Sequence, residues 1–234
     1  MADVADDSFL AQTLIFKGGT CAAMLGYLDR FSVDIDFDCF KDEIIDKVKL
    51  NLTKVFDTHN LMIKKSLDKA IMYELNYPNP KGRSTLKVSI NTILSPKDQH
   101  VTAYFPDINR HLVSQTIETM FANKLVAITG RFDKHGIVAG RDLYDIHHFF
   151  LSGYAFDSSV IEDRTAQSIQ EYLKLLLEFI PAHFNQDTIN QDLNHLLDPK
   201  QFQSIRKVLL SQTIMFLNME LEKHKAIKEH PSIT

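Results

Sequence analysis

The sequence has little cysteine: its 234 residues include two, Cys21 and Cys39, and no C-x-x-C pair. Two cysteines do not make a disulfide framework, and they are too few for a zinc site by themselves. Free cysteine is among the most buried residue types in proteins. We therefore expect both thiols to be small hydrophobic side chains of the core.

Long apolar runs and an excess of positive charge are also missing. No stretch approaches the ~20 apolar residues of a membrane span, and the acidic start, MADVADDSFL, lacks the layout of a signal peptide. Lysine and arginine number 26 against 30 aspartates and glutamates, a formal net charge of −4. This balance excludes the usual basic nucleic-acid footprint, so a polynucleotide partner would need a local basic patch. We expect a cytoplasmic protein without membrane association.

The hydrophobic pattern of the first half is typical of mixed α/β structure. It predicts helices over residues 21–27 and 41–59 and strands over residues 14–16, 32–38, 70–75 and 84–92. Thr20 is expected to be the N-cap of the first helix. The segment 77–82, YPNPKG, has turn chemistry throughout and joins the last two strands.

After about residue 113 the strand pattern fades and helical stripes replace it. The apolar spacing predicts helices over residues 114–131, 141–151, 169–180 and 201–228. No repeat or low-complexity segment interrupts them. The sequence thus predicts an α+β fold, with a small mixed β-sheet domain and flanking helices over residues 1–112. A C-terminal helical bundle is expected over residues 113–234.

The segment 32–38, SVDIDFD, alternates polar and apolar residues with a period of two. In a strand this pattern places Asp34 and Asp36, with Arg30, Ser32 and Asp38 if the strand begins early enough, on one face. Neighbouring carboxylates on one face repel each other, but they become useful when divalent cations lie between them. Magnesium prefers oxygen ligands and retains phosphates as partners, and two such ions can hold both oxygens of a phosphoryl displacement.

Gly18 and Gly19 follow the first predicted strand and supply a second element of the same chemistry. Glycines after a strand let backbone N–H groups approach phosphate oxygens closely, and the helix N-terminus beyond them favours anions. Thr20 adds a hydroxyl donor. A phosphate-binding turn and a carboxylate pair some fifteen residues apart are the minimum apparatus for handling a triphosphate, although each feature alone is usually a plain turn or a solvated strand face.

Two blocks of the sequence resemble one protein family. The residues Lys17-Gly18-Gly19-Thr20 with Arg30-x-Ser32-x-Asp34-x-Asp36-Phe37 resemble the polymerase-beta-type nucleotidyltransferases, and more narrowly the AbiEii-type toxin nucleotidyltransferases. A second block resembles the family's downstream segment: Lys124-Leu125-x-Ala127, then Arg131, then Arg141-Asp142-Leu143-Tyr144-Asp145-Ile146. The blocks bracket residues 17–146.

The resemblance implies a nucleotidyltransferase domain that transfers a nucleoside monophosphate from an NTP to an acceptor with Mg²⁺ or Mn²⁺. In related toxins the acceptor is the 3′ end of tRNA, and an antitoxin encoded alongside neutralises the toxin. An RNA acceptor and a cognate antitoxin are therefore expected partners. Asp34 and Asp36 would be metal ligands. The expected nucleotide-binding residues are Lys17, Gly18, Gly19, Thr20, Arg30 and Ser32. Lys124, Asp142 and Asp145 complete the expected catalytic set, with Lys124 meeting phosphate charge.

One departure from the superfamily pattern concerns the third carboxylate. Many members carry it on a later strand, whereas Ser89 or Asn91 occupies the corresponding strand here. Glu74 on the preceding strand, or Asp142 or Asp145, could replace it. Two alternatives to an RNA-modifying enzyme follow: transfer to a small molecule or a protein hydroxyl, and a catalytically silent nucleotide-binding module.

The pair His147-His148 raises the question of a histidine metal site with Asp142 and Asp145. Adjacent positions on a helix face about 100° apart, so both imidazoles cannot easily share one ion. We therefore expect packing or supporting roles for the two histidines.

Overall fold

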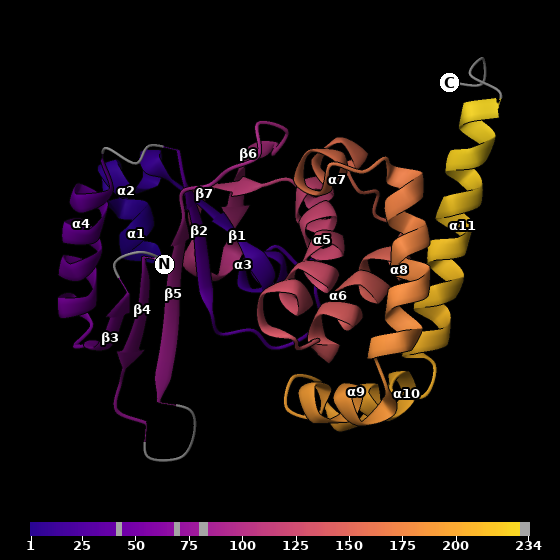
Figure 1. Ribbon diagram of the computed structural model, residues 1–234. Coiled ribbons are helices and arrows are strands. Elements are labelled where there is room, and N and C mark those ends of the chain that lie inside the picture. Colours follow the sequence, from indigo (N-terminus) through magenta and orange to yellow (C-terminus); the bar gives the residue numbers. More distant parts are fainter. Residues whose placement is uncertain (41–43, 68–70, 80–83, 230–234) are drawn as a thin grey trace. The chain divides into compact units, whose positions relative to one another are not determined.

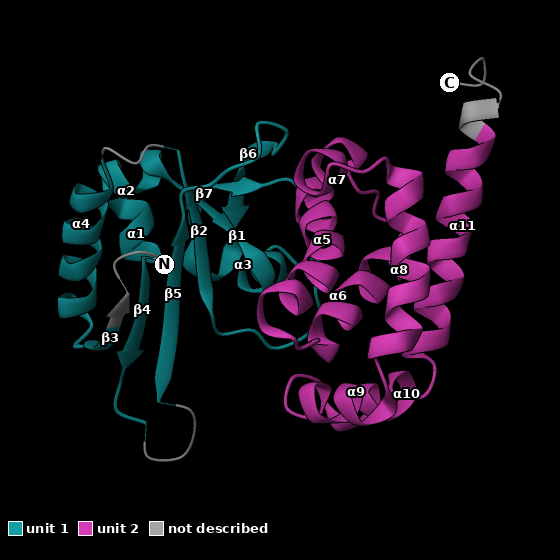
Figure 2. Ribbon diagram, viewed as in Figure 1, with its two compact units in different colours: residues 1–116 teal, residues 117–234 magenta. Residues whose placement is uncertain are grey.

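The structure of the chain is a computed structural model that describes residues 1–40, 44–67, 71–79 and 84–229. The chain divides into two compact units, Met1–Thr116 (unit 1) and Ile117–Thr234 (unit 2), which Figure 2 colours separately. The fold is α+β as predicted, with a mixed sheet in the first unit and helices in the second. Both cysteines are buried, as expected.

Unit 1 is built on a seven-stranded mixed sheet within the described residues, with strand order β3-β4-β5-β2-β1-β7-β6 (Figure 1). The strands are β1 (Leu14–Lys17), β2 (Ile35–Cys39), β3 (Met62–Leu67), β4 (Met72–Asn76), β5 (Thr85–Asn91), β6 (His100–Phe105) and β7 (Arg110–Gln115). Strand β2 pairs antiparallel with β1 and parallel with β5. The strand with the predicted carboxylates is therefore the middle strand of the sheet.

One face of this sheet is covered by helices. The helices of unit 1 are α1 (Ala2–Asp6), α2 (Ser8–Thr13), α3 (Gly18–Met24), α4 (Ile45–Thr58) and the 3₁₀ turn η3 (Pro106–Ile108). Val4 of α1 and Leu52 of α4 line a cavity of about 350 Å³ together with Phe37 of β2 and Val88 of β5. Because side chains alternate along a strand, Asp36 and Asp38 project from the opposite face.

The core beside the predicted site is aromatic. Phe16 of β1 is fully buried, and its ring centroid lies 5.5 Å from that of Phe37 and 5.6 Å from that of Phe105. Aromatic pairs at this spacing add to the stabilisation that comes from burial alone. The three rings thereby pack β1, β2 and β6 together beneath the face that carries Asp36 and Asp38.

Two local predictions around β2 are wrong. The strand begins at Ile35, not at Ser32, because the Thr20 hydroxyl donates a hydrogen bond to the Asp34 carbonyl and lies 3.0 Å from the Ser32 hydroxyl. The preceding segment is thereby bonded to α3. Thr20 is not the N-cap: the helix begins at Gly18 with Lys17 as its cap residue.

Other elements of unit 1 differ in extent from the prediction. Strands β4 and β5 lie within the predicted ranges to within a residue or so, and α4 begins later than expected. Residues 41–43, residue 70 and residues 80–82 of the predicted helix, strand and turn lie outside the described residues. Strands β3, β6 and β7 were not predicted. Because β7 extends to Gln115, the helix expected from residue 114 begins at Ile117.

Unit 2 consists of packed helices. They are α5 (Ile117–His135), α6 (Gly140–Leu151), α7 (Ser158–Thr165), α8 (Ile169–His183), α9 (Gln186–Leu193), α10 (Pro199–Ile205) and α11 (Leu209–Glu229). A capping box formed by Ser168 and Glu171 starts α8, which continues past Pro181 to His183. The single helix predicted over residues 201–228 is divided into α10 and α11.

The hydroxyl of Tyr172 links two helices in the core of unit 2. It donates a hydrogen bond to the Leu125 carbonyl at 3.1 Å and lies 3.0 Å from the Thr129 hydroxyl. Burial raises the pKa of Tyr172 to about 12, so the phenol stays protonated and can donate. Among the described helices of the chain, none is long and apolar enough to cross a membrane.

Candidate active site

The turn between β1 and α3 approaches the middle strand at Gly18. Gly18 has a φ of +79°, a conformation that side chains rarely adopt. A Cβ atom at this position would lie 2.6 Å from the Oδ2 atom of Asp36. Glycine is therefore required here both by the backbone and by the carboxylate that contacts it.

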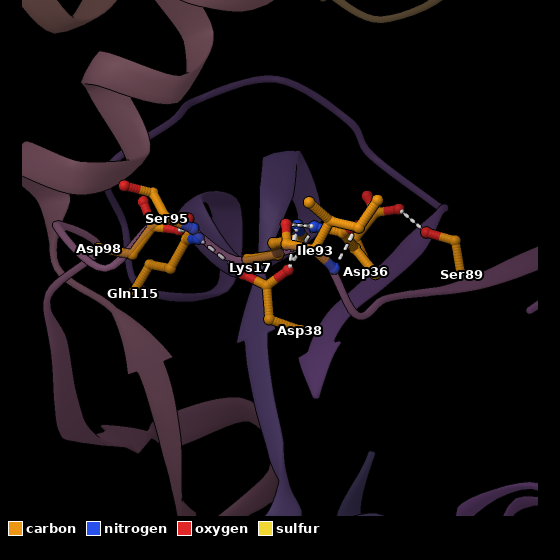
Figure 3. A network of polar contacts seen from close by, with 9 residues as sticks. Lys17, Asp36, Asp38, Ser89, Ile93, Ser95, Asp98 and Gln115 are labelled. Atoms are coloured by element: carbon orange, nitrogen blue, oxygen red, sulfur yellow. Dashed lines mark hydrogen bonds and ion pairs between the residues drawn. The ribbon is translucent and has the colours of Figure 1, made fainter. Parts of the chain in front are cut away.

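Asp36 belongs to β2, which lies between β1 and β5 in the sheet. The register places it opposite Lys17 of β1 and beside Ser89 of β5. The Ser89 hydroxyl donates a hydrogen bond to Asp36 Oδ1, as Figure 3 shows. The side chain is partly exposed, so this carboxylate is oriented by neighbours without being buried.

The remaining predicted nucleotide-binding residues gather around the first turn of α3. A Cβ atom on Gly19 would lie 2.8 Å from an Arg30 guanidinium nitrogen and 3.1 Å from the Ser32 hydroxyl oxygen. Arg30 is buried and donates a hydrogen bond to the Phe31 carbonyl at 3.0 Å. Thr20 bonds the Ser32 hydroxyl and the Asp34 backbone, as described above. Asp34 itself is partly exposed and directly precedes β2.

Asp38 also belongs to this group, although it was not among the residues predicted to form the site. Its side chain is fully buried and forms an ion pair with Lys17. Gln115 of β7 donates a hydrogen bond to its Oδ2 atom at 2.9 Å (Figure 3). Asn91 of β5 donates one to Oδ1 at 3.2 Å. The alternation that placed Asp38 on this face was a usable signal for it. Nothing in the local pattern pointed to Gln115.

On β5, the strand on which a third carboxylate was expected, neutral side chains lie beside the two aspartates. Ser89 lies beside Asp36 and Asn91 beside Asp38 in the β2–β5 register. Glu74 does not substitute for them: it pairs with Lys87 in the register and forms a 2.9 Å ion pair with Lys64, which lowers its pKa. Within the described residues, no group of three or more histidine, cysteine or acidic side chains could hold a metal ion.

A second charged cluster lies in unit 2 and contains the downstream predicted residues. Lys124 of α5 forms an ion pair with Asp145 of α6 at 2.8 Å and with Asp142 at 3.4 Å. Arg131 adds an ion pair to Asp142 at 2.9 Å. Both carboxylates are buried, whereas the lysine side chain is 19% exposed. The structure thus brings Lys124, Asp142 and Asp145 together within unit 2, and Asp34 and Asp36 belong to unit 1.

The two adjacent histidines have different surroundings. His147 is buried, and its Nε2 atom lies 2.8 Å from the Gln212 side-chain oxygen. Burial lowers its pKa, an effect that the Gln212 hydrogen bond opposes and His148 increases. The ring of His148 instead stacks on Tyr144, with centroids 6.0 Å apart. These contacts are the packing roles that the sequence predicted.

Comparison with known proteins gives one family match. The family model described as "Nucleotidyl transferase AbiEii toxin, Type IV TA system" matches residues 1–218. No curated protein matches the chain.

Two solved structures from Helicobacter pylori share the fold. JHP933 has 22% sequence identity and a TM-score of 0.51, covering 97% of this chain and 92% of its own. A candidate nucleotidyltransferase has 22% identity and a TM-score of 0.54, covering 95% of this chain and 91% of its own. At such identities the likeness concerns the fold alone. The match over residues 1–218 carries the assignment further: the chain belongs to the AbiEii family of toxin nucleotidyltransferases and is a nucleotidyltransferase.

Proposed function

We propose that this enzyme transfers a nucleoside monophosphate from an NTP to the 3′ end of a tRNA, with Mg²⁺ as the preferred ion. The observation that carries the proposal is the contact between the Asp36 carboxylate and the Gly18 turn. A metal ligand and a backbone segment able to receive phosphate are thereby held side by side. Acting on tRNA, and controlled by a cognate antitoxin, the enzyme would work in the cytoplasm.

The donor set fits a hard divalent cation. Asp36 is partly exposed and, among the described residues, accepts one hydrogen bond, that of Ser89, so it retains oxygen lone pairs for another partner. Asp34 lies two residues earlier, directly before β2, and the hydroxyls of Thr20 and Ser32 nearby are also oxygen donors. Mg²⁺ is commonly bound by one or two carboxylates together with substrate phosphates. Asp34 and Asp36 would hold the ion, which would neutralise charge on the reacting phosphates.

The turn residues are proposed to orient the triphosphate. Backbone N–H groups of Gly18 and Gly19 would face phosphate oxygens, and the cation of Arg30 lies directly against Gly19. Thr20 holds Ser32 and the Asp34 backbone at the same turn. The acceptor hydroxyl oxygen would form a bond to the α-phosphorus while the bond to pyrophosphate breaks, and the hydroxyl proton would pass to solvent.

Lys124 is proposed to bind phosphate charge. Its side chain is 19% exposed, whereas the two carboxylates that it pairs with are buried. Asp142 and Asp145 already accept from cations, so we assign them to holding Lys124 rather than to removing a proton. Arg131 compensates the second negative charge of the cluster.

A labelling assay tests the function. Purified protein is incubated with each of the four labelled NTPs, Mg²⁺ and total tRNA, beside an Asp36→Asn variant. An Asp6→Asn variant is the control, because Asp6 is an exposed carboxylate of the same unit that pairs with Arg110. We expect label on tRNA with the wild type and the control, and none with Asp36→Asn.

Three other outcomes would contradict the proposal. Equal labelling by the wild type and Asp36→Asn would show that Asp36 is not the metal ligand. Labelling of a small hydroxyl compound or of protein in place of tRNA would identify another acceptor class. NTP binding by calorimetry without transfer to any acceptor would indicate a silent binding module.

A further inference from the structure

Two carboxylates on the same face of β2 have opposite surroundings. Asp38 is fully buried, whereas Asp36 is partly exposed. Asp38 accepts from the Lys17 ammonium and from the amides of Gln115 and Asn91, which come from β1, β7 and β5. Asp36 accepts from one neutral hydroxyl, that of Ser89. The negative charge of Asp38 is therefore compensated inside the protein, and that of Asp36 is not compensated by a cation among the described residues.

The Lys17 side chain pairs with a residue other than the one directly opposite it in the register. In the antiparallel β1–β2 register, Lys17 lies directly opposite Asp36, and Ile15 lies opposite Asp38. Opposite residues are the closest neighbours across such a pair. The Lys17 ammonium nevertheless pairs diagonally with Asp38 (Figure 3). A lysine side chain has three donors and a flexible stem, so its ammonium can reach the carboxylate that attracts it most strongly.

The position of the Lys17 ammonium affects whether Asp36 can bind a cation. An ammonium group beside Asp36 would occupy the carboxylate that a divalent ion needs, and like charges disfavour each other at short range. Burial makes Asp38 the stronger partner, since an uncompensated carboxylate inside the protein is far more costly than one in contact with water. The buried aspartate thus holds the lysine away from its exposed neighbour.

We propose that Asp38 is a positioning residue that retains the Lys17 ammonium and so leaves Asp36 available to a divalent cation. The inference rests on the proposed function, because it takes Asp36 as a metal ligand. It adds a role for the third aspartate of the segment, which neither binds the ion nor contacts the nucleotide. Lys17 is then a fixed part of the site, held in place before substrate arrives.

The test measures binding of Mn²⁺ alone, by calorimetry and by the electron paramagnetic resonance signal of the free ion. In Asp38→Asn the lysine is released and competes at Asp36, so the Mn²⁺ dissociation constant should rise about tenfold, the order expected for one added cation near a partly solvated carboxylate. In the double variant Lys17→Met/Asp38→Asn no cation is left to compete. Its affinity should return to within about twofold of the wild type. Asp6→Asn, which changes the net charge equally, should bind as the wild type does.

The outcomes separate this inference from the proposed function. If Asp36→Asn binds Mn²⁺ as tightly as the wild type, the metal site itself is misassigned. If Asp36→Asn weakens binding but Asp38→Asn does not, the positioning role is refuted and the metal site stands. A double variant as weak as Asp38→Asn would also refute it. Thermal unfolding of each variant monitors folding, and Asp38→Ser, which leaves space for a water molecule, replaces Asp38→Asn if that protein does not fold.

Discussion

The Ser89 hydroxyl donates a hydrogen bond to the Asp36 carboxylate across the parallel β2–β5 pair, where the register places the two residues side by side. Ser89→Ala removes this donor and leaves a partly exposed carboxylate that water can solvate. A hydrogen bond to a charged group contributes about 1.5–3 kcal/mol at most. We therefore expect turnover to fall by about tenfold, a factor that corresponds to about 1.4 kcal/mol. Steady-state kinetics over a range of Mg²⁺ concentrations measure it, and complete loss of turnover would mean that Ser89 takes part in proton removal.

Gly18→Ala should inactivate the enzyme more than any other small-residue change in unit 1. The added Cβ would lie 2.6 Å from Asp36 Oδ2, in addition to the strain of a φ of +79°. Gly26→Ala is the matched control, because Gly26 has a φ of +76° and no atom within 4 Å of such a Cβ. Both variants should lose about 1–2 kcal/mol of unfolding free energy from the backbone. Nucleotidyl transfer should fail in Gly18→Ala alone, and similar activity in the two would show that the Gly18–Asp36 contact has no role.

In the variant Lys124→Met, unit 2 should unfold more readily, because the substitution removes the ammonium that pairs with the buried Asp145 carboxylate. Removing one partner of a buried ion pair costs about 3–5 kcal/mol. The double variant Lys124→Met/Asp145→Asn should recover most of the stability in chemical denaturation. If Lys124 binds phosphate, the stable double variant should remain inactive in the labelling assay. Recovery of activity together with stability would assign the lysine a purely structural role.

The buried His147 predicts a loss of stability on acidification. Burial lowers its pKa in the folded protein, so the unfolded chain takes up the proton first. The stabilisation is complete above the unfolded value of about 6.5, and it is lost as the pH falls through the window below that value. In His147→Gln the free energy of unfolding should change less between about pH 8 and about pH 5. Denaturation curves at each pH test this, and parallel curves for the two proteins would show that another group is responsible.

The alternation of the aspartate segment was sufficient to predict which side chains of β2 share a face. Its apolar partners, Phe37 among them, pack under α1 and α4, so the pattern follows from burial on one side alone. The start of the strand could not be predicted in this way. It depends on the hydrogen bond from Thr20 to the Asp34 carbonyl, which joins residues 14 positions apart and leaves no trace in local periodicity.

The strands that were not predicted, β6 and β7 among them, lack the alternation of polar and apolar residues from which a strand is predicted. Most residues of β6 are exposed or half-buried on both sides, so its sequence has no clean alternation. In β7 the buried positions include the polar residues Ser114 and Gln115. Gln115 is buried because it bonds Asp38, 77 residues earlier in the chain. Contacts of this kind are decided by the assembled sheet and not by neighbouring residues.

The central position of β2 bears on how the enzyme responds to partial unfolding. Among the described strands, three lie on each side of it, and the outermost are β3 on one side and β6 on the other. Opening that begins at an edge would have to dissolve the intervening pairings before the aspartates separate from the glycine turn, and outer elements of a protein open at lower free energy than its core. Fraying at the edges of the sheet, or a ligand that loosens them, would therefore leave the relative positions of Asp36 and Gly18 intact until the central strands separate.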